Sequence, residues 1–315
     1  MKKSRPPGLQ AVSESTMLQQ LAIPITAAAQ KLADAAADIA LSPASERDAC
    51  YLHAVLCQVG MPRKKTAALS FERTNGAASL LITAGKLWDG RSWVQQQLPY
   101  GPKPRLILIN LTSTAVATGS RFVDVGRSTR EFLERMGLPP QGSEYRSLRR
   151  QISSLAACRM QLGGRFGGEI VNLDTQPIHR FNVWVVPDVH QQTLWPGVVE
   201  LSQEYFDHVR DAAVPLDERA VAALRGTALG LDLYAWLAHR LWRIRDANGV
   251  IVPWQAIKSQ FGQEYVHLKD CRKEVRSVLR QVLALYSRAR VDEVRGGLLL
   301  RPSPPPIPRV VVTVR

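Results

Sequence analysis

Residues 253–300 read PWQAIKSQFGQEYVHLKDCRKEVRSVLRQVLALYSRARVDEVRGGLLL. A proline at position 253, followed by apolar residues at helical spacing, predicts a short helix that ends at Gly262. The longer apolar pattern at 267–286 predicts a second helix. Two apolar segments that flank the turn Arg295-Gly296-Gly297 predict a hairpin. The stretch therefore predicts a short helix, a turn, a long helix and a two-stranded hairpin.

An earlier stretch repeats this order. Ser128-Thr129-Arg130-Glu131 has the residue types of a capping box and opens a short apolar helix that Pro139 and Pro140 end. A second apolar pattern, capped at Ser143, predicts a longer helix, and a glycine-marked turn at 163–168 then separates two apolar segments. This order is typical of a winged helix-turn-helix. Because it occurs twice, we predict an α+β chain of tandem winged helix-turn-helix domains.

Length and charge set wider bounds. The 315 residues are 45% hydrophobic, which is enough for two domains with cores of their own. Forty-one Lys and Arg against 27 Asp and Glu give a net charge of +14, which favours a polyanionic partner such as nucleic acid. We predict a variable N-terminal segment (1–43), a first winged-helix domain (44–195), a second winged-helix DNA-binding domain (196–302) and a C-terminal tail (303–315).

Four further patterns concern local structure and compartment. Residues 44–59 have a helical pattern, and residues 67–71 and 79–83 predict a hairpin across Thr74-Asn75-Gly76. The most apolar long stretch, 21–41, is interrupted by proline and charged residues, so we predict no membrane span and a cytoplasmic location. The four cysteines are too few and too scattered for a disulfide framework, which agrees with a reducing compartment.

The helix predicted at 267–286 segregates its charges. On a wheel of about 100° per residue its apolar side chains form one stripe, and five cations occupy the adjoining face: Lys269, Arg272, Lys273, Arg276 and Arg280. A solvated face typically places opposite charges at i and i+4, whereas this helix places like charges at that spacing. A row of phosphates would remove the repulsion, so we predict that these five cations bind DNA.

The first copy has a smaller basic face. Arg146, Arg149 and Arg150 lie opposite its apolar stripe, which suits contact with phosphates or with guanine. Arg165 and Arg295 occur in glycine-marked turns and are predicted to be wing tips that reach the DNA backbone or the minor groove. The alternative interpretation of these five arginines is a solvated helix face and solubilising turn residues.

Motifs of common enzymes are absent from the sequence. Gly85-Lys86 is followed by leucine, so it lacks the Ser or Thr of a phosphate-binding loop, and the glycines at 163–168 lack dinucleotide-binding spacing. No histidine spacing or Glu-x-Lys motif typical of nucleases occurs. Cys50, His53 and Cys57 would share a helix face and offer soft ligands to zinc, but a fourth ligand is missing, so we interpret them as buried structural residues. We predict a protein that is not an enzyme and that binds no cofactor and no metal.

Several stretches resemble the plasmid-encoded RepA-type replication initiators. They cover roughly residues 95–305 and comprise LPYG (98–101), PRLIL (104–108), 128–138, GLDLYAWL (230–237), 254–261, 275–282 and LLLRPS (298–303). The resemblance implies a non-enzymatic initiator that binds repeated sites, or iterons, in double-stranded DNA at a plasmid origin. It also implies that the protein helps to open the adjacent duplex and recruits host replication initiation and helicase proteins.

The resemblance also assigns roles to residues. It implies base reading by Lys269, Arg272, Lys273 and Arg276, and phosphate positioning by Arg146, Arg149 and Arg150. Where the family often has an aromatic residue at the head of the second recognition helix, this chain has Asp270-Cys271, so the bases that it reads are left open.

Other interpretations of the sequence stay open. A sequence-specific transcriptional repressor would use the same winged-helix domains and needs only occupancy of its site. A nicking nuclease would show metal-dependent cleavage, and a structural interaction protein would fail to bind any duplex. The resemblance further implies a homodimer, and hairpin segments before residue 95 or the tail Val310-Val311-Val312 could supply pairable edges, whereas a frayed tail would not.

Overall fold

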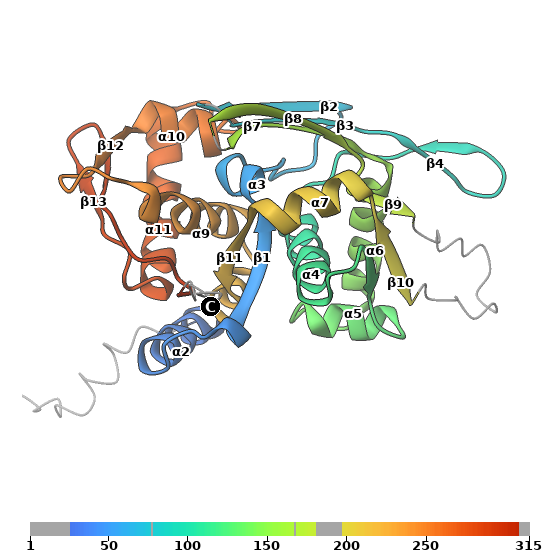
Figure 1. The fold of residues 1–315 in the computed structure, drawn as a ribbon, viewed down its shortest axis with the longest axis horizontal. Helices are drawn as coiled ribbons and strands as arrows, with labels where there is room; N and C mark the ends of the chain where they lie inside the picture. The colour runs from blue at the N-terminus through green and yellow to red at the C-terminus, as the bar shows by residue number, and fades with distance from the viewer. Residues whose placement is uncertain (1–25, 77, 167, 181–196, 309–315) are drawn as a thin grey trace, which may run out of the picture.

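The computed structural model describes residues 26–76, 78–166, 168–180 and 197–308. The elements near the C-terminus form a unit that we call the C-terminal module. It consists of α9 (Ala228–Arg240), β12 (Val250–Pro253), α10 (Trp254–Phe261), α11 (Leu268–Leu285), β13 (Val291–Val294) and β14 (Gly297–Leu300). Its strands form an antiparallel sheet in the order β12-β14-β13 (Figure 1). This is the connectivity of a winged helix-turn-helix with β13 and β14 as the wing, so the prediction from residues 253–300 is confirmed.

The N-terminal module repeats this connectivity. It consists of α4 (Pro102–Thr118), β6 (Phe122–Asp124), α5 (Thr129–Arg135), α6 (Gly142–Ala157), β9 (Ile178–Arg180) and β10 (Val198–Leu201). The sheet order is β6-β10-β9, which matches the order of the C-terminal module. The predicted α+β architecture is confirmed and the same connectivity occurs twice, but the predicted first wing around residues 163–168 is wrong. The wing strands of this module are β9 and β10.

The hairpin around residues 163–168 belongs to another sheet. Its strands are β7 (Arg159–Phe166) and β8 (Glu169–Thr175), and they extend the predicted hairpin of β2 (Ser70–Asn75) and β3 (Ala78–Thr83). The order β2-β3-β7-β8 runs along the top of Figure 1. Leu80 and Ile82 of β3 lie opposite Leu162 and Met160 of β7, and all four side chains are buried. The inserted hairpin therefore pairs with β3 because the two strands bury one continuous apolar face.

A two-stranded ribbon lies at the centre of the molecule. The predicted helix at 44–59 is wrong, because this segment forms the 3-10 turn η1 (Glu46–Asp48), β1 (Ala49–His53) and α3 (Ala54–Gln58). β1 pairs with β11 (Ala213–Asp217), about 165 residues away in the chain. Backbone pairing with a distant strand overrides the local helical pattern, which is a common limit of propensity arguments.

The remaining elements surround these units. A small hairpin of β4 (Lys86–Trp88) and β5 (Trp93–Gln95) projects from the right of Figure 1. The helical elements outside the modules are α2 (Ala27–Leu41), α7 (Gln203–Ala212), α8 (Glu218–Leu224) and the 3-10 turn η2 (Leu241–Arg243). One hydrophobic core extends through both modules, and β10, which follows the predicted boundary at 195/196, lies in the N-terminal module. The predicted division into four segments stays a prediction.

A buried ion pair joins the two modules. The Arg105 side chain of α4 donates from Nε and Nη2 to the two carboxylate oxygens of Asp232 in α9, at 2.6 and 2.7 Å. Its other N–H groups donate to the carbonyl oxygens of Met61, Pro62 and Gly101. The two charged side chains are only 3% and 6% exposed, so the pair fixes α4 against α9.

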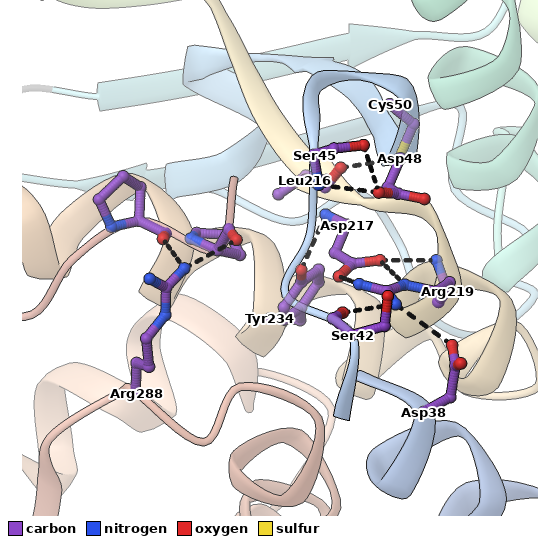
Figure 2. A network of polar contacts seen from close by, with 12 residues as sticks. Asp38, Ser42, Ser45, Asp48, Cys50, Leu216, Asp217, Arg219, Tyr234 and Arg288 are labelled. Carbon is purple, nitrogen blue, oxygen red and sulfur yellow. Dashed lines mark hydrogen bonds and ion pairs between the residues drawn. The ribbon is translucent and has the colours of Figure 1, made fainter. Parts of the chain in front are cut away.

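A second polar network holds α2 against the C-terminal half of the fold, and Figure 2 shows it. Arg219 binds the carboxylate of Asp217, reaches Asp38 at 3.2 Å and donates to the carbonyl oxygen of Ser42 at 2.9 Å. These contacts, led by the hydrogen bond to Asp217, raise the pKa of Arg219 above its ordinary value. The Asp217 N–H donates to the hydroxyl of Tyr234 at 2.9 Å. Residues 27–41 are therefore tied to α8 by a specific contact between Asp38 and Arg219.

Candidate nucleic-acid interface

α11 places its cations on the side that its core residues leave to solvent. Its buried residues are Cys271, Val275, Val278, Leu279, Val282 and Leu285. Lys269, Lys273, Arg276 and Arg280 are exposed, and Arg272 is half-buried. The predicted amphipathic helix is confirmed, since the described helix has the same apolar stripe and the same basic face. The role of these cations in DNA binding stays a prediction.

Two of the five cations lie between α11 and the wing. Arg276 Nε donates to Glu293 Oε2 of β13 at 2.7 Å, and Arg272 Nη2 lies 3.8 Å from Glu293 Oε1. The hydrogen bond from Arg276 lowers the pKa of Glu293. Both guanidinium groups also lie over the ring of the buried Trp254, at 5.2 and 5.5 Å from its centroid. Glu293 and Trp254 therefore orient the two arginines beside the wing.

The basic face of α6 is smaller. Leu148, Ile152 and Leu155 are buried, as the sequence predicts. Arg146 and Arg150 are exposed and Arg149 is half-buried. Arg150 Nη1 donates to the hydroxyl of Tyr100 at 3.4 Å.

The start of α6 differs from the prediction. The helix begins at Gly142, with Gln141 rather than Ser143 as its N-cap. The backbone at Gln141 is extended (φ −111°, ψ 156°), which is the usual conformation of an N-cap residue, so the helix begins at the next residue.

The two turn arginines have different positions. Arg295 is exposed in the turn between β13 and β14, where Gly296 takes a φ of 96°, and its contact with DNA stays a prediction. Arg165 lies opposite Ile170 in the inserted hairpin β7–β8. Its interpretation as a wing tip is wrong, because this hairpin pairs with β3 and is not part of a winged unit. Its side chain lines a cavity instead.

Sequence reasoning missed several charged residues that the fold brings together. Arg240, Arg243 and Arg245 line the same cavity as Arg165. The run His239-Arg240-Leu241-Trp242-Arg243-Ile244-Arg245, with its clustered arginines, was a signal that could have found them. Glu293 had no such signal, because its partner lies on another element.

The candidate zinc ligands do not share a helix face. Cys50 and His53 lie in β1 and Cys57 in α3. Burial raises the pKa of both thiols, and His53 Nε2 lies 3.0 Å from Nδ1 of His208. Among the residues that the structure describes, no three His, Cys, Asp or Glu are grouped as a metal site would require. In the same residues, each helix is too short or too polar to cross a bilayer.

Comparisons with known proteins identify similar sequences and folds. Residues 98–256, half of the chain, match the family model described as "Plasmid encoded RepA protein". No curated protein matches the chain. The fold is similar to a crystal structure of RctB domains 2–3, with a TM-score of 0.46 and 11% identity over 76% of this chain and 85% of that chain. A selenomethionine derivative of RctB domains 2 and 3 gives 0.47 and 11%, over 78% and 95%.

Proposed function

The chain belongs to the family of plasmid encoded RepA proteins, which are replication initiators, and on this premise we propose that it binds iterons in double-stranded DNA at a plasmid origin. In this proposal it helps to open the adjacent duplex and recruits host replication initiation and helicase proteins. It acts in the cytoplasm by binding and not as an enzyme. The residues that match the family model end before α11, so the match itself does not include the DNA-reading surface.

The observation that carries this proposal is the basic face of α11 beside the wing. A helix of this kind fits the major groove, and its exposed cations meet base edges and phosphates there. Lys269, Arg272, Lys273 and Arg276 lie in the first half of α11, which is the part that reads bases in helix-turn-helix proteins. We assign phosphate contacts to Arg146, Arg149 and Arg150 of α6, to Arg280 of α11 and to Arg295 of the wing turn.

Two single variants separate reading from positioning. Arg276→Ala should weaken binding to the cognate repeats by about 5- to 150-fold and bind unrelated duplex almost unchanged. Arg146→Ala should weaken binding to both duplexes alike and reduce the slope of log K against log salt by about one. Fluorescence anisotropy at several salt concentrations measures both. Equal losses on both duplexes for Arg276→Ala would contradict base reading by α11.

Replication itself requires a test in cells. A plasmid that carries the DNA flanking the gene, but not the gene, should be recovered only when the protein is supplied from a second replicon. Footprinting on the same DNA should show protection at regularly spaced repeats. Protection without plasmid recovery would favour a transcriptional repressor, and metal-dependent nicking of the supercoiled plasmid would favour a nuclease.

We also propose that the protein forms a homodimer, as the family resemblance implies. The β4–β5 hairpin supports this, since Trp88 and Trp93 lie opposite each other and are 48% and 65% exposed. The other predicted edge, residues 310–312, lies outside the described residues. Sedimentation should show a dimer that the Trp93→Lys variant weakens, and a monomer at every concentration would contradict the proposal.

A further inference from the structure

A basic cavity lies between the inserted hairpin and the end of α9. Its volume is about 700 Å³, and its lining includes Arg165 from β7 and Arg240, Arg243 and Arg245 from the segment that leads to β12. Among the described residues of the lining the one carboxylate is Asp211. Arg210 Nε already donates to its Oδ1 at 3.2 Å. Four guanidinium groups therefore share a cavity with one carboxylate that has a partner outside the lining.

The Nε–H donor of Arg240, at the end of α9, has no acceptor among the described residues. This Nε atom is buried, and burial lowers the pKa of the side chain. A charged donor that is buried without an acceptor is unfavourable, because it has lost its hydrogen bonds to water and makes no hydrogen bond within the protein. Arg243, by contrast, is held by the carbonyl oxygen of His239 and lies 4.1 Å from the centroid of Trp242. The cavity thus combines an oriented guanidinium with one that needs an acceptor.

The other lining residues indicate the chemistry of the ligand. Burial, together with the charges of Arg243 and Arg240, lowers the pKa of His239 to about 3, so this imidazole is neutral and offers an N–H without further repulsion. The apolar part of the lining is aliphatic: Ala54, Ala212, Ala213, Ile244 and Val250. The described lining contains no Phe, Tyr or Trp side chain on which a base could stack. Recognition here depends on negative charge and oxygen acceptors, which are the properties of phosphate groups.

We propose that this cavity binds backbone phosphates of DNA that is held by the two modules. The proposal rests on the proposed DNA-binding function and adds a third contact surface to α6 and α11. The lining comes from α3, the inserted hairpin, α7, β11 and the C-terminal module, so a strand in the cavity is contacted by the C-terminal module and by elements outside both modules. Free polyphosphate has the same chemistry, and the experiment distinguishes the two sources.

The double variant Arg240→Gln/Arg245→Gln tests the cavity in the full-length chain. Anisotropy is measured with a duplex that carries the repeats and with an unrelated duplex, each at several salt concentrations. The slope of log K against log salt should fall in magnitude by about two on both duplexes, since each phosphate contact contributes roughly 0.9. The matched control, Arg47→Gln/Arg159→Gln, removes two exposed arginines outside the cavity and should leave the slope unchanged. If the double variant misfolds, the single variant Arg245→Gln at an exposed position replaces it, and the magnitude of the slope should then fall by about one.

Calorimetric titration with sodium tripolyphosphate supplies the second arm. An unchanged slope in the variants, with specificity retained, overturns backbone binding. If the slope is unchanged, but the wild-type chain binds tripolyphosphate and the variants do not, the cavity binds free polyphosphate. If the slope is unchanged and the wild-type chain binds no tripolyphosphate, the cavity is not a phosphate site. If the wild-type chain binds no duplex, the proposed function fails, and the tripolyphosphate titration decides the cavity by itself.

Discussion

The replacement Asp232→Asn tests whether the buried ion pair couples the two modules. Arg105 lies in α4 and Asp232 in α9. The guanidinium group of Arg105 donates to both carboxylate oxygens of Asp232 and to three backbone carbonyl oxygens. Asparagine keeps the shape of the side chain but offers a single oxygen, and its NH₂ group faces an N–H of Arg105. The variant therefore leaves a buried cation without a counter-charge.

The expected loss follows from these contacts. Two hydrogen bonds between charged partners are replaced by one hydrogen bond from the cation to an uncharged oxygen and one donor–donor contact, while the cation stays buried. Breaking a buried pair in this way costs about 3–5 kcal/mol. With an m-value of about 3 kcal/mol per molar urea, the unfolding midpoint should fall by at least about 1 M.

Urea unfolding followed by tryptophan fluorescence measures this shift. The control is Asp174→Asn, which breaks an Arg159–Asp174 pair whose side chains are 67% and 41% exposed, and its midpoint should barely move. If Asp232→Asn shifts the midpoint no more than this control does, the buried pair does not stabilise the module junction. A second transition in the variant would show that the modules then unfold separately.

Three further results are expected. Burial is the main cause that lowers the pKa of His53 and of His239 to about 3. Below pH 6.5 the unfolded state therefore binds more protons than the folded state, and the free energy of unfolding should fall by about 2 kcal/mol for each histidine at pH 5. Urea midpoints at pH 7 and pH 5 measure this fall. Gly60→Ala should destabilise the fold by about 1–3 kcal/mol, because its Cβ would lie 2.4 Å from the carboxylate that pairs with Arg105; thermal unfolding measures this. Glu293→Gln should strengthen DNA binding by severalfold at low salt, because Arg276 no longer has to leave a carboxylate; anisotropy measures this.

Each of these results has a matched control. His53→Gln should remove about half of the pH dependence, and an identical midpoint at pH 7 and pH 5 in the wild type would contradict the buried neutral histidines. Gly142→Ala, at a position where a Cβ meets nothing within 4 Å, should change stability little. Weaker binding by Glu293→Gln would show that the carboxylate positions Arg276 for DNA instead of competing with it.

The basic face of α11 could be predicted from sequence because the information is local. Apolar residues at helical spacing decide which side of the helix is buried, and the cations take the side that remains. The same holds for the wing of the C-terminal module, where a glycine turn lies between two apolar segments. A charge pair such as Arg276 with Glu293 is different, since its members lie on elements whose relative position the packing sets.

In residues 128–173 and 253–300 the sequence by itself determined the order of two helices and a hairpin, since turn residues and apolar periodicity act over a few residues. Only the tertiary structure decided which strands pair. An alternating pattern in β7 specifies one buried face but not its neighbour, so β7 was free to pair with β3 instead of forming a wing. In the same way β1 became a strand because β11 offered backbone partners from a distant part of the chain. That pairing and the inserted hairpin brought Arg165 and Arg240 to the lining of one cavity, which depends on long-range packing and has no counterpart in local sequence.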